Sequence, residues 1–271
     1  MPTVGFAKVL AGAKSFKDQG IANLSDTYRG QILIGQTEVR TAIIKDIPIR
    51  EVANEVLAAT LAIAISLPVP PPFLALASPS DLPTKHASKL GGSSLLFASA
   101  DVNSPSVAQI VVAQAGVGQA AAINLVSNAM KNCGQLGEFY GFDGWAANID
   151  RHTGNILVAS NQRPWLIDHG RAFTGGAWKP ADLDPSKLYR HRLKEWLTPV
   201  LNDAEQKRFS SLAAAMVPKL GALDLKAIGE QNRLPALIGQ EDFNLLVTFL
   251  TDRIAFVPRI AADALNQARI V

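Results

Sequence analysis

Two short apolar runs, separated by a polar turn and bordered by acidic and amide side chains, constrain the fold of this chain more than any other feature. The first run covers residues 156–158 and the second covers residues 165–167. Short strands joined by a polar turn form a hairpin, which brings their outer ends together. We therefore expect Asp168, which follows the second strand, to lie beside Asn155, which precedes the first.

The side chains at this junction suit one kind of chemistry. Asp168 and Asn155 offer the hard oxygen ligands that Mg2+ prefers, and this ion usually takes its remaining ligands from phosphate oxygens and water. Asp150, earlier on the same loop, is expected to face an incoming hydroxyl group and to accept or orient its proton. Each residue alone would be an ordinary turn residue. The ordered set, with two apolar strands between the metal ligands, predicts phosphoryl transfer.

An upstream segment supports this interpretation independently. A strand-forming run over residues 39–44 ends in Lys45, and apolar residues at helical spacing follow over residues 49–65. This helix carries Glu51 and Glu55, one turn apart on a similar face, so either could pair with the lysine. In kinases, a strand lysine contacts the α- and β-phosphates and a helix glutamate holds its ammonium in place. The segment therefore predicts a nucleotide-phosphate site.

The pattern Asp-Arg-His-x-x-Asn at 150–155, followed by Ile-Asp-His-Gly at 167–170, resembles the catalytic and metal-binding segments of the HipA-like kinases. It is more distantly similar to those of the phosphatidylinositol kinases. The helix that carries Glu55, with the Leu-Pro-x-Pro turn at 67–70, also resembles the HipA-like pattern. This second match favours Glu55 over Glu51 as the partner of the lysine. The resemblance extends over roughly residues 40–173.

The resemblance implies a two-lobed α+β fold of the protein-kinase-like type. Residues 1–98 would form a small β-rich N-terminal lobe, and residues 99–271 a mostly helical C-terminal lobe that carries the catalytic and metal-binding loops. A strand over residues 95–99 is expected to run into the connector that binds adenine, and the expected contacts are Leu96, Phe97 and Ala98. Apolar spacing predicts helices over residues 107–113, 120–132, 139–147, 186–196, 203–216, 223–228 and 240–257. Side chains expected only to pack are Trp178, Trp196, Phe243 and Phe249.

The loop that would cover the phosphates is not clear from the sequence. Residues 9–15 contain small side chains between two expected strands, and backbone amides in such a turn could face phosphate. Residues 17–30 are an alternative, because they form a polar segment with the composition of a long loop. Both candidates stay open.

In function, the resemblance implies an ATP- and Mg2+-dependent kinase that transfers the γ-phosphoryl group to a hydroxyl, with a protein Ser or Thr as the expected acceptor. The implied partners are ATP, a protein substrate and an antitoxin-like or regulatory protein. The chain is expected to begin directly in the small lobe, whereas toxins of the family often have a longer N-terminal region. The toxin role, the antitoxin partner and an aminoacyl-tRNA synthetase-like target therefore stay open. Three different activities would use the same residues: those of a phosphatidylinositol-type lipid kinase, an AMP transferase on the same fold, and a nucleotide-binding pseudokinase or scaffold.

Composition narrows the class of protein further. A net charge of +3 is too small to argue for direct binding of nucleic acid. Cys133 is the single cysteine, so no intrachain disulfide can form, and the four histidines are too scattered for a zinc site. The N-terminus lacks the features of a secretory signal, which predicts a cytoplasmic protein without a membrane span. The basic segment at 187–194 is expected to be a solvated helix face, with docking of an acidic or phosphate-bearing substrate as the alternative.

Overall fold

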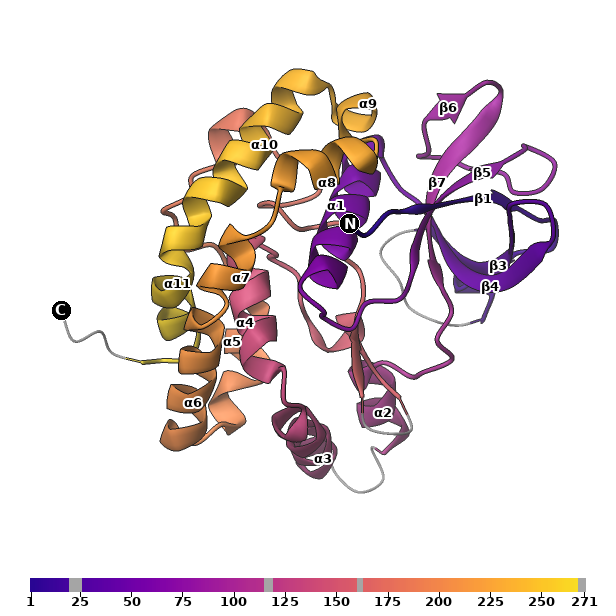
Figure 1. Ribbon diagram of the computed structural model, residues 1–271. Helices are drawn as coiled ribbons and strands as arrows, with labels where there is room; N and C mark the ends of the chain where they lie inside the picture. Colours follow the sequence, from indigo (N-terminus) through magenta and orange to yellow (C-terminus); the bar gives the residue numbers. More distant parts are fainter. Residues whose placement is uncertain (20–25, 115–118, 160–162, 268–271) are drawn as a thin grey trace.

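The computed structural model describes residues 1–19, 26–114, 119–159 and 163–267. A sheet-rich N-terminal part is followed by a helical C-terminal part, which agrees with the mixed α+β class predicted from the sequence (Figure 1). The strands are β1 (Gly5–Val9), β2 (Lys14–Ser15), β3 (Asp26–Ile34), β4 (Glu38–Asp46), β5 (Pro72–Ala77), β6 (Lys89–Leu90), β7 (Ser93–Ala100), β8 (Ile156–Val158) and β9 (Pro164–Leu166). The α-helices are α1 (Ile49–Ala64), α2 (Val107–Ala113), α3 (Gln119–Asn132), α4 (Leu136–Trp145), α5 (Arg192–Trp196), α6 (Asp203–Ala214), α7 (Val217–Gly221), α8 (Leu225–Gln231), α9 (Leu234–Ile238), α10 (Gln240–Arg253) and α11 (Val257–Ala264).

The N-terminal sheet closes on itself. Its strands follow the order β1-β5-β7-β4-β3, and β1 also pairs with β3, so five strands form a small barrel. Alternate side chains point to opposite faces of each strand. Ala42 and Ile44 of β4 and Leu96 and Ala98 of β7 therefore face the barrel interior, where they belong to one buried apolar cluster. The alternate side chains, Ile43 and Lys45 of β4 and Phe97 of β7, point out of the barrel toward the rest of the molecule.

Helix α1 lies between the barrel and the C-terminal helices (Figure 1). It contacts β5 and β7 on one side and α8 and α9 on the other. Its sequence is buried without interruption from Val52 to Ala62. Apart from Thr60, whose hydroxyl bonds to carbonyls of the same helix, the polar residues in this stretch are Asn54 and Glu55. A helix that is buried on all sides must satisfy its polar side chains inside the protein. Those two side chains therefore mark where α1 meets other polar groups.

Helix α4 reaches the centre of the C-terminal part because one of its faces is made of glycine. A Cβ atom at Gly137 would lie 2.5 Å from Cβ of Leu212 on α6, and one at Gly144 would lie 2.7 Å from Cγ2 of Ile260 on α11. Such distances are shorter than real contacts between carbon atoms. Only glycine at these positions therefore lets α6 and α11 pack this closely against α4. The end of α4 is thereby fixed, and residues 148–155 follow directly from it.

One expected helix is shorter than the sequence indicates. The apolar spacing predicts a helix over residues 186–196, but α5 begins only at Arg192. The buried guanidinium of Arg253 on α10 donates hydrogen bonds to the carbonyl oxygens of Pro185 and Lys187, at 2.8 and 2.9 Å. The Lys187 carbonyl is therefore held by a distant side chain instead of by a helical turn. Arg253 also stacks on the ring of Tyr189, with its Cζ 4.9 Å from the ring centre.

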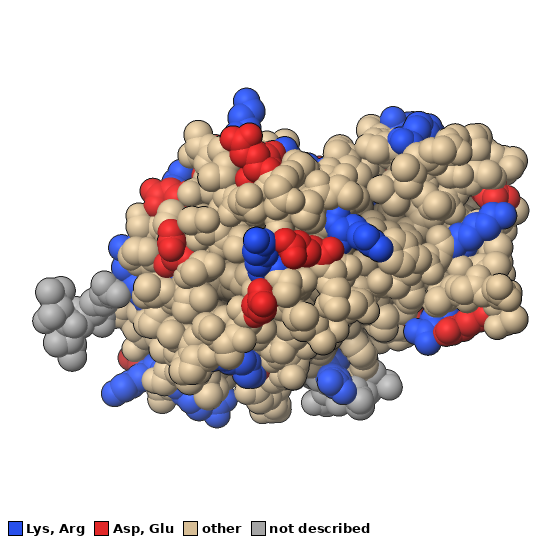
Figure 2. All heavy atoms as spheres, turned by 45° about the horizontal axis from the view of Figure 1, so that its top comes forward, with Lys and Arg blue, Asp and Glu red and all other residues tan. Residues whose placement is uncertain are grey.

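Charges on the surface are mixed. On the face drawn in Figure 2, lysine and arginine side chains alternate with aspartate and glutamate side chains, and wide uncharged areas separate them. This face has no continuous basic track of the kind that nucleic-acid binding uses. Within the described ranges, no helix has both the length and the apolar character needed to cross a bilayer.

Candidate active site

Lys45 lies at the centre of a buried group of charges. Its Nζ is 2.6 Å from Oε1 of Glu55 on α1 and 2.9 Å from Oδ1 of Asp168, which follows β9. Burial alone would lower the pKa of Lys45, but attraction to Asp168 and Glu55 outweighs burial and raises that pKa. Burial acts to raise the pKa of Asp168, but the ammonium outweighs it and lowers that pKa. Lys45 and Asp168 are therefore ionised at neutral pH.

Glu55 and Glu51 have different surroundings. The second oxygen of Glu55, Oε2, accepts the backbone N–H of His169 at 2.9 Å, so this carboxylate bridges the lysine and the loop after β9. Glu51 packs against the backbone of that loop, because a Cβ atom at Gly176 would lie 2.6 Å from its Oε1. Of the two candidates, the structure pairs Glu55 with Lys45.

The predicted hairpin is present, and its strands are β8 and β9. Ile156 pairs with Leu166, and the N–H of Ile167 donates to the carbonyl of Asn155 at 3.1 Å. These contacts place Asn155 beside Ile167, one residue before Asp168, which is the residue that the sequence predicts beside Asn155. Asp168 has a φ of 59°, in the left-handed region that few residues other than glycine, asparagine and aspartate occupy readily. The backbone turns sharply here and directs the carboxylate toward Lys45.

Asp150 occupies the loop between α4 and the hairpin. Its backbone N–H donates to Oδ1 of Asn148 at 3.1 Å, and its carbonyl accepts Nδ2 of Asn155 at 2.7 Å. The carboxylate itself is partly exposed. It lies 3.5 Å from Nη1 of Arg192 and 3.8 Å from Nε of Arg171. The loop is therefore held by its backbone, and the carboxylate stays available to a group that enters from solvent.

Asn155 and Asp168 fit a divalent cation. The Nδ2 of Asn155 donates a hydrogen bond to the carbonyl of Asp150. The other polar atom of this amide, Oδ1, is an acceptor and can serve as a metal ligand. Asp168 adds an ionised carboxylate. In the part of the chain that the structure describes, no three His, Cys, Asp or Glu side chains are grouped to hold an ion by themselves. A cation here would need phosphate or water oxygens as well, and Mg2+ bound with a nucleotide has this kind of coordination.

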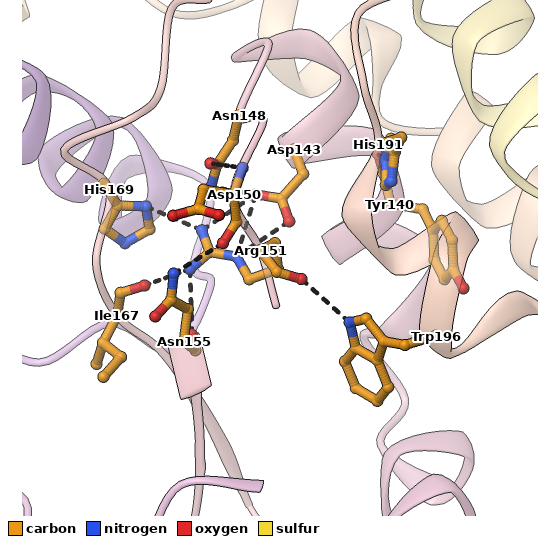
Figure 3. A network of polar contacts seen from close by, with 10 residues as sticks. All are labelled: Tyr140, Asp143, Asn148, Asp150, Arg151, Asn155, Ile167, His169, His191 and Trp196. Carbon is orange, nitrogen blue, oxygen red and sulfur yellow. Dashed lines mark hydrogen bonds and ion pairs between the residues drawn. The ribbon is translucent and has the colours of Figure 1, made fainter. Parts of the chain in front are cut away.

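Arg151 ties the pieces of the site together (Figure 3). It is fully buried and forms an ion pair with Asp143 on α4, with Nε and Oδ2 3.0 Å apart. Its Nη1 donates to the carbonyl oxygens of Asn155, just before β8, and Ile167, just after β9. Its Nη2 is 3.0 Å from Nδ1 of His169. One side chain thus joins α4, the hairpin and the loop after it.

His169 remains neutral in this network. Burial, reinforced by the positive charges of Arg151 and Lys45, holds the pKa of His169 well below its usual range. Because a guanidinium can only donate, Nδ1 of His169 accepts from Arg151, and the ring proton resides on Nε2. His169 therefore orients the loop through hydrogen bonds and carries no charge.

We expect an Asp143→Ala variant to be destabilised by about 3–5 kcal/mol, because it leaves the Arg151 guanidinium buried without a countercharge. Urea unfolding of the purified protein measures this loss. Glu38→Ala is the matched control, since Glu38 pairs with Arg40 in an exposed ion pair and should lose less than about 1 kcal/mol. Equal small losses in the two variants would show that the buried pair is not important for stability.

A cavity opens beside Lys45, between the barrel and the hairpin. Its apolar walls include Val69, Phe97 and Leu166, and its charged end contains Lys45 and Asp168. The other described residues around it are Ile43, Glu55, Ala59, Pro70, Ser99, Ala100, Asp101, Val102, Leu157, Ile167 and His169. A slot with apolar walls and a charged end suits a ligand that has a flat ring at one end and anionic groups at the other.

The strand next to this cavity differs in detail from the expected adenine contacts. Of Leu96, Phe97 and Ala98, only Phe97 faces the cavity, because alternate residues of β7 point into the barrel. The backbones of Leu96 and Ala98 also pair with β4 or β5. The cavity instead extends along residues 99–102, where β7 ends. Of the three expected contacts, Phe97 alone has its side chain on this cavity, and the adenine contacts themselves stay a prediction.

The two candidates for a phosphate-covering loop lie next to each other in the sheet. Residues 9–15 include the end of β1 and all of β2. Residues 17–30 begin in a short 3-10 helix, Lys17–Gln19, and end in β3. The centre of the second candidate, residues 20–25, lies outside the described residues.

Several residues to which the sequence pattern assigns no role contribute to this site. Asp143 could have been noticed as an acid in the otherwise apolar second half of helix α4. Trp178 and Trp196 do more than pack, since their ring N–H groups donate to Asn54 Oδ1 at 3.0 Å and to the carbonyl of Arg151 at 3.1 Å. A buried tryptophan usually needs such a partner, but the sequence does not show which one.

Comparison with known proteins agrees with this geometry. A family model described as HipA-like kinase matches residues 41–220, a span that contains Lys45, Glu55, Asp150, Asn155 and Asp168. Among solved structures, the chain is similar to the crystal structure of a Helicobacter pylori proinflammatory kinase, CtkA. The TM-score is 0.56 at 12% sequence identity, and the match covers 99% of this chain and 100% of the other. At this identity the similarity supports the fold alone. No curated protein sequence matches.

Proposed function

Because this chain belongs to the HipA-like kinase family, we propose that it binds ATP with a divalent cation and transfers the γ-phosphoryl group to a hydroxyl of a protein Ser or Thr. In this proposal residues 1–98 act as the small lobe and residues 99–271 as the helical lobe, with the nucleotide between them. The adenine ring lies against Phe97 and residues 99–102. The phosphates lie toward Lys45.

The arrangement of four side chains carries this proposal. Lys45 is held by Glu55 and also touches Asp168, while the hairpin places Asn155 next to the residue that precedes Asp168. A pseudokinase would be expected to have lost at least one of these groups or their contacts. Lys45 would contact the phosphates, and Asp168 and Asn155 would hold Mg2+. When bound, the cation would neutralise phosphate charge and orient the transferred group.

Asp150 would act on the acceptor. Its carboxylate accepts the hydroxyl proton, or orients the hydroxyl, as the acceptor oxygen forms a bond to the γ-phosphorus and the bond from that phosphorus to the ADP oxygen breaks. Its position supports this role, because its backbone is fixed by Asn148 and Asn155 while its carboxylate is open to solvent. Protein kinases place an aspartate in the same relation to an asparagine metal ligand.

Labelled ATP tests the proposal directly. The purified protein is incubated with ATP labelled on the γ- or the α-phosphate, with and without Mg2+, together with a mixture of Ser- and Thr-containing peptides. We expect only γ-label to be transferred, in an Mg2+-dependent manner, and mass spectrometry identifies the modified residue. Transfer of the α-label would instead show an AMP transferase. An absence of label, with no nucleotide binding by calorimetry, would show a pseudokinase.

A further inference from the structure

The position proposed for the acceptor hydroxyl is surrounded by arginines. Arg192 Nη1 is 3.5 Å from one oxygen of Asp150, and Arg171 Nε is 3.8 Å from the other. Arg190, two residues before Arg192, forms an ion pair with Glu195 and adds a third guanidinium to this segment. A group that approaches Asp150 therefore meets positive charge near each oxygen of this carboxylate.

These arginines are only partly neutralised. Glu195 lies 2.5 Å from Arg190 and 3.2 Å from Arg192, so one carboxylate serves two guanidiniums. Arg171 has half of its side chain exposed and lies at 3.8 Å from its acidic neighbour, beyond hydrogen-bond length. The three guanidiniums thus share only two carboxylates, those of Asp150 and Glu195. An incoming anion would therefore find donors that need little rearrangement.

The backbone holds Arg171 next to the acceptor position. The N–H of Ile149, directly before Asp150, donates to the carbonyl of Arg171 at 3.4 Å. Arg192 is the first residue of α5, and Leu193 beside it is fully buried. The two guanidiniums thus extend from anchored backbone toward different oxygens of the Asp150 carboxylate. Such an arrangement recognises carboxylates or phosphates through charge and paired N–H donors.

From this geometry we propose that the acceptor is an acidic polypeptide segment, in which Arg171 and Arg192 bind carboxylates that flank the phosphorylated Ser or Thr. The inference rests on the proposed kinase function and adds the class of acceptor. In an extended peptide, residues two positions away from the hydroxyl residue point to the same face. Acidic residues at these positions would lie on either side of Asp150, where the arginines are.

Matched peptides test this specificity. One peptide has Ser flanked by Glu two positions away on each side, and the other has Gln at the same positions. We expect the wild-type protein to show about tenfold higher kcat/KM for the Glu peptide at low salt, a preference that falls at high salt because these groups are exposed. The Arg171→Gln, Arg192→Gln double variant should use both peptides equally well. Arg40→Gln, a change of an exposed arginine in the barrel, should keep the preference.

The outcomes separate this inference from the proposed function. Equal use of the two peptides by the wild-type protein, or a preference that survives in the double variant, would overturn the acidic-acceptor proposal and leave the kinase function intact. Transfer of the γ-label to neither peptide, with label on another class of molecule, would overturn the protein acceptor and the acidic-acceptor proposal together.

A separate observation concerns Asn54 on α1, which is almost fully buried. Its Nδ2 donates to the carbonyl oxygens of Gly170, Ala172 and Gly175 at 2.8, 3.1 and 3.1 Å. Three carbonyls of the loop after Asp168 therefore converge on one amide. Within this loop Phe173 and Thr174 have φ values of 56° and 78°, a left-handed conformation that costs free energy unless surrounding contacts hold it.

We infer that Asn54 is a positioning residue for the metal-binding aspartate. Asn54 and Glu55 are neighbours on one helix. Glu55 holds the N–H of His169, directly after Asp168, and Asn54 holds the carbonyls that follow. Together they fix both the start and the continuation of the loop relative to Lys45. Loss of the amide donors would release the loop and shift Asp168, without removing any group that touches nucleotide.

An Asn54→Asp variant tests this role, since it keeps the side-chain size but replaces the donors with acceptors that repel the carbonyls. We expect kcat for γ-phosphoryl transfer to fall at least about tenfold, because small displacements of reacting groups are costly. The Mg2+ concentration for half-maximal activity should rise. Asn232→Asp is the matched control, because Asn232 is a fully buried amide that binds the carbonyls of Pro2 and Ile228 away from the site.

The control should lose stability without any change in Mg2+ dependence. If Asn54→Asp behaves in the same way as Asn232→Asp, with lower stability but unchanged Mg2+ dependence and kcat, then Asn54 has only a structural role. Since both variants are compared with an active wild-type protein, this result would not bear on the kinase function itself.

Discussion

An Asp168→Asn variant is expected to lose at least about 10³-fold of its Mg2+-dependent phosphoryl transfer, because removal of one preorganised charge at a reacting phosphate has effects of this size. The variant keeps the shape of the side chain but supplies a neutral amide in place of an ionised ligand. Initial rates with γ-labelled ATP at several Mg2+ concentrations measure the loss. Nearly full activity would rule out Asp168 as the metal ligand.

The fold should tolerate this change. Lys45 retains Glu55 as its partner at 2.6 Å, so the ammonium is not left alone when the charge of Asp168 is removed. Asparagine also accepts the left-handed backbone at φ 59°, whereas alanine there adds strain of about 1 kcal/mol. Asp168→Ala should therefore be equally inactive but somewhat less stable than Asp168→Asn. Asp252→Asn, an exposed change on α10, is the control and should have normal activity.

Local patterns in the sequence were sufficient to locate much of the site. The hairpin formed by β8 and β9 follows from two apolar runs and a polar turn, and its pairing places Asn155 in contact with Ile167, the residue before Asp168. Helix α1 ends within one residue of the predicted boundary. The Lys45–Glu55 pair followed from strand and helix positions together with the family resemblance. These features depend on residues that are close in the chain.

Contacts between distant residues could not be predicted in this way. The barrel closes because β1 pairs in parallel with β5, from Gly5 with Phe73 onward, and nothing in either strand specifies that partner. The side chains of Leu96 and Ala98, two of the expected adenine contacts, lie away from the cavity for a related reason. A strand that closes a barrel buries alternate side chains inside it, so only Phe97 of the three remained on the cavity side.

Buried polar side chains were the other main gap. Asn54 is located in an apolar helix and binds carbonyls more than one hundred residues away, and the sequence alone does not reveal this partner. The sequence also does not reveal the partners of Arg253. Its hydrogen bonds to the carbonyls of Pro185 and Lys187 hold the start of the expected helix over residues 186–196 out of a helical conformation. A buried polar residue in an apolar helix indicates that a partner exists. The identity of the partner comes only from the fold.

The second large effect is expected for Asp150→Asn. If this carboxylate accepts or orients the hydroxyl proton, its loss should lower kcat by about 10²–10⁴-fold, the usual range for a general acid or base. The affinity for ATP should change little, because the Asp150 carboxylate lies beside arginines and does not line the cavity next to Lys45, where the nucleotide is proposed to bind. Single-turnover kinetics measure the chemical step, and calorimetry with a non-hydrolysable ATP analogue measures binding.

The backbone of this loop should keep its position in the Asp150→Asn variant. The hydrogen bonds that fix this loop use the backbone N–H and carbonyl of Asp150, and neither is altered by the change of side chain. Loss of the negative charge leaves Arg171 and Arg192 without this neighbour, but both are partly exposed and can be solvated. Weak ATP binding with a normal chemical step would therefore contradict the assigned role. A slow chemical step with normal ATP binding would place Asp150 at the acceptor hydroxyl, and not at the nucleotide.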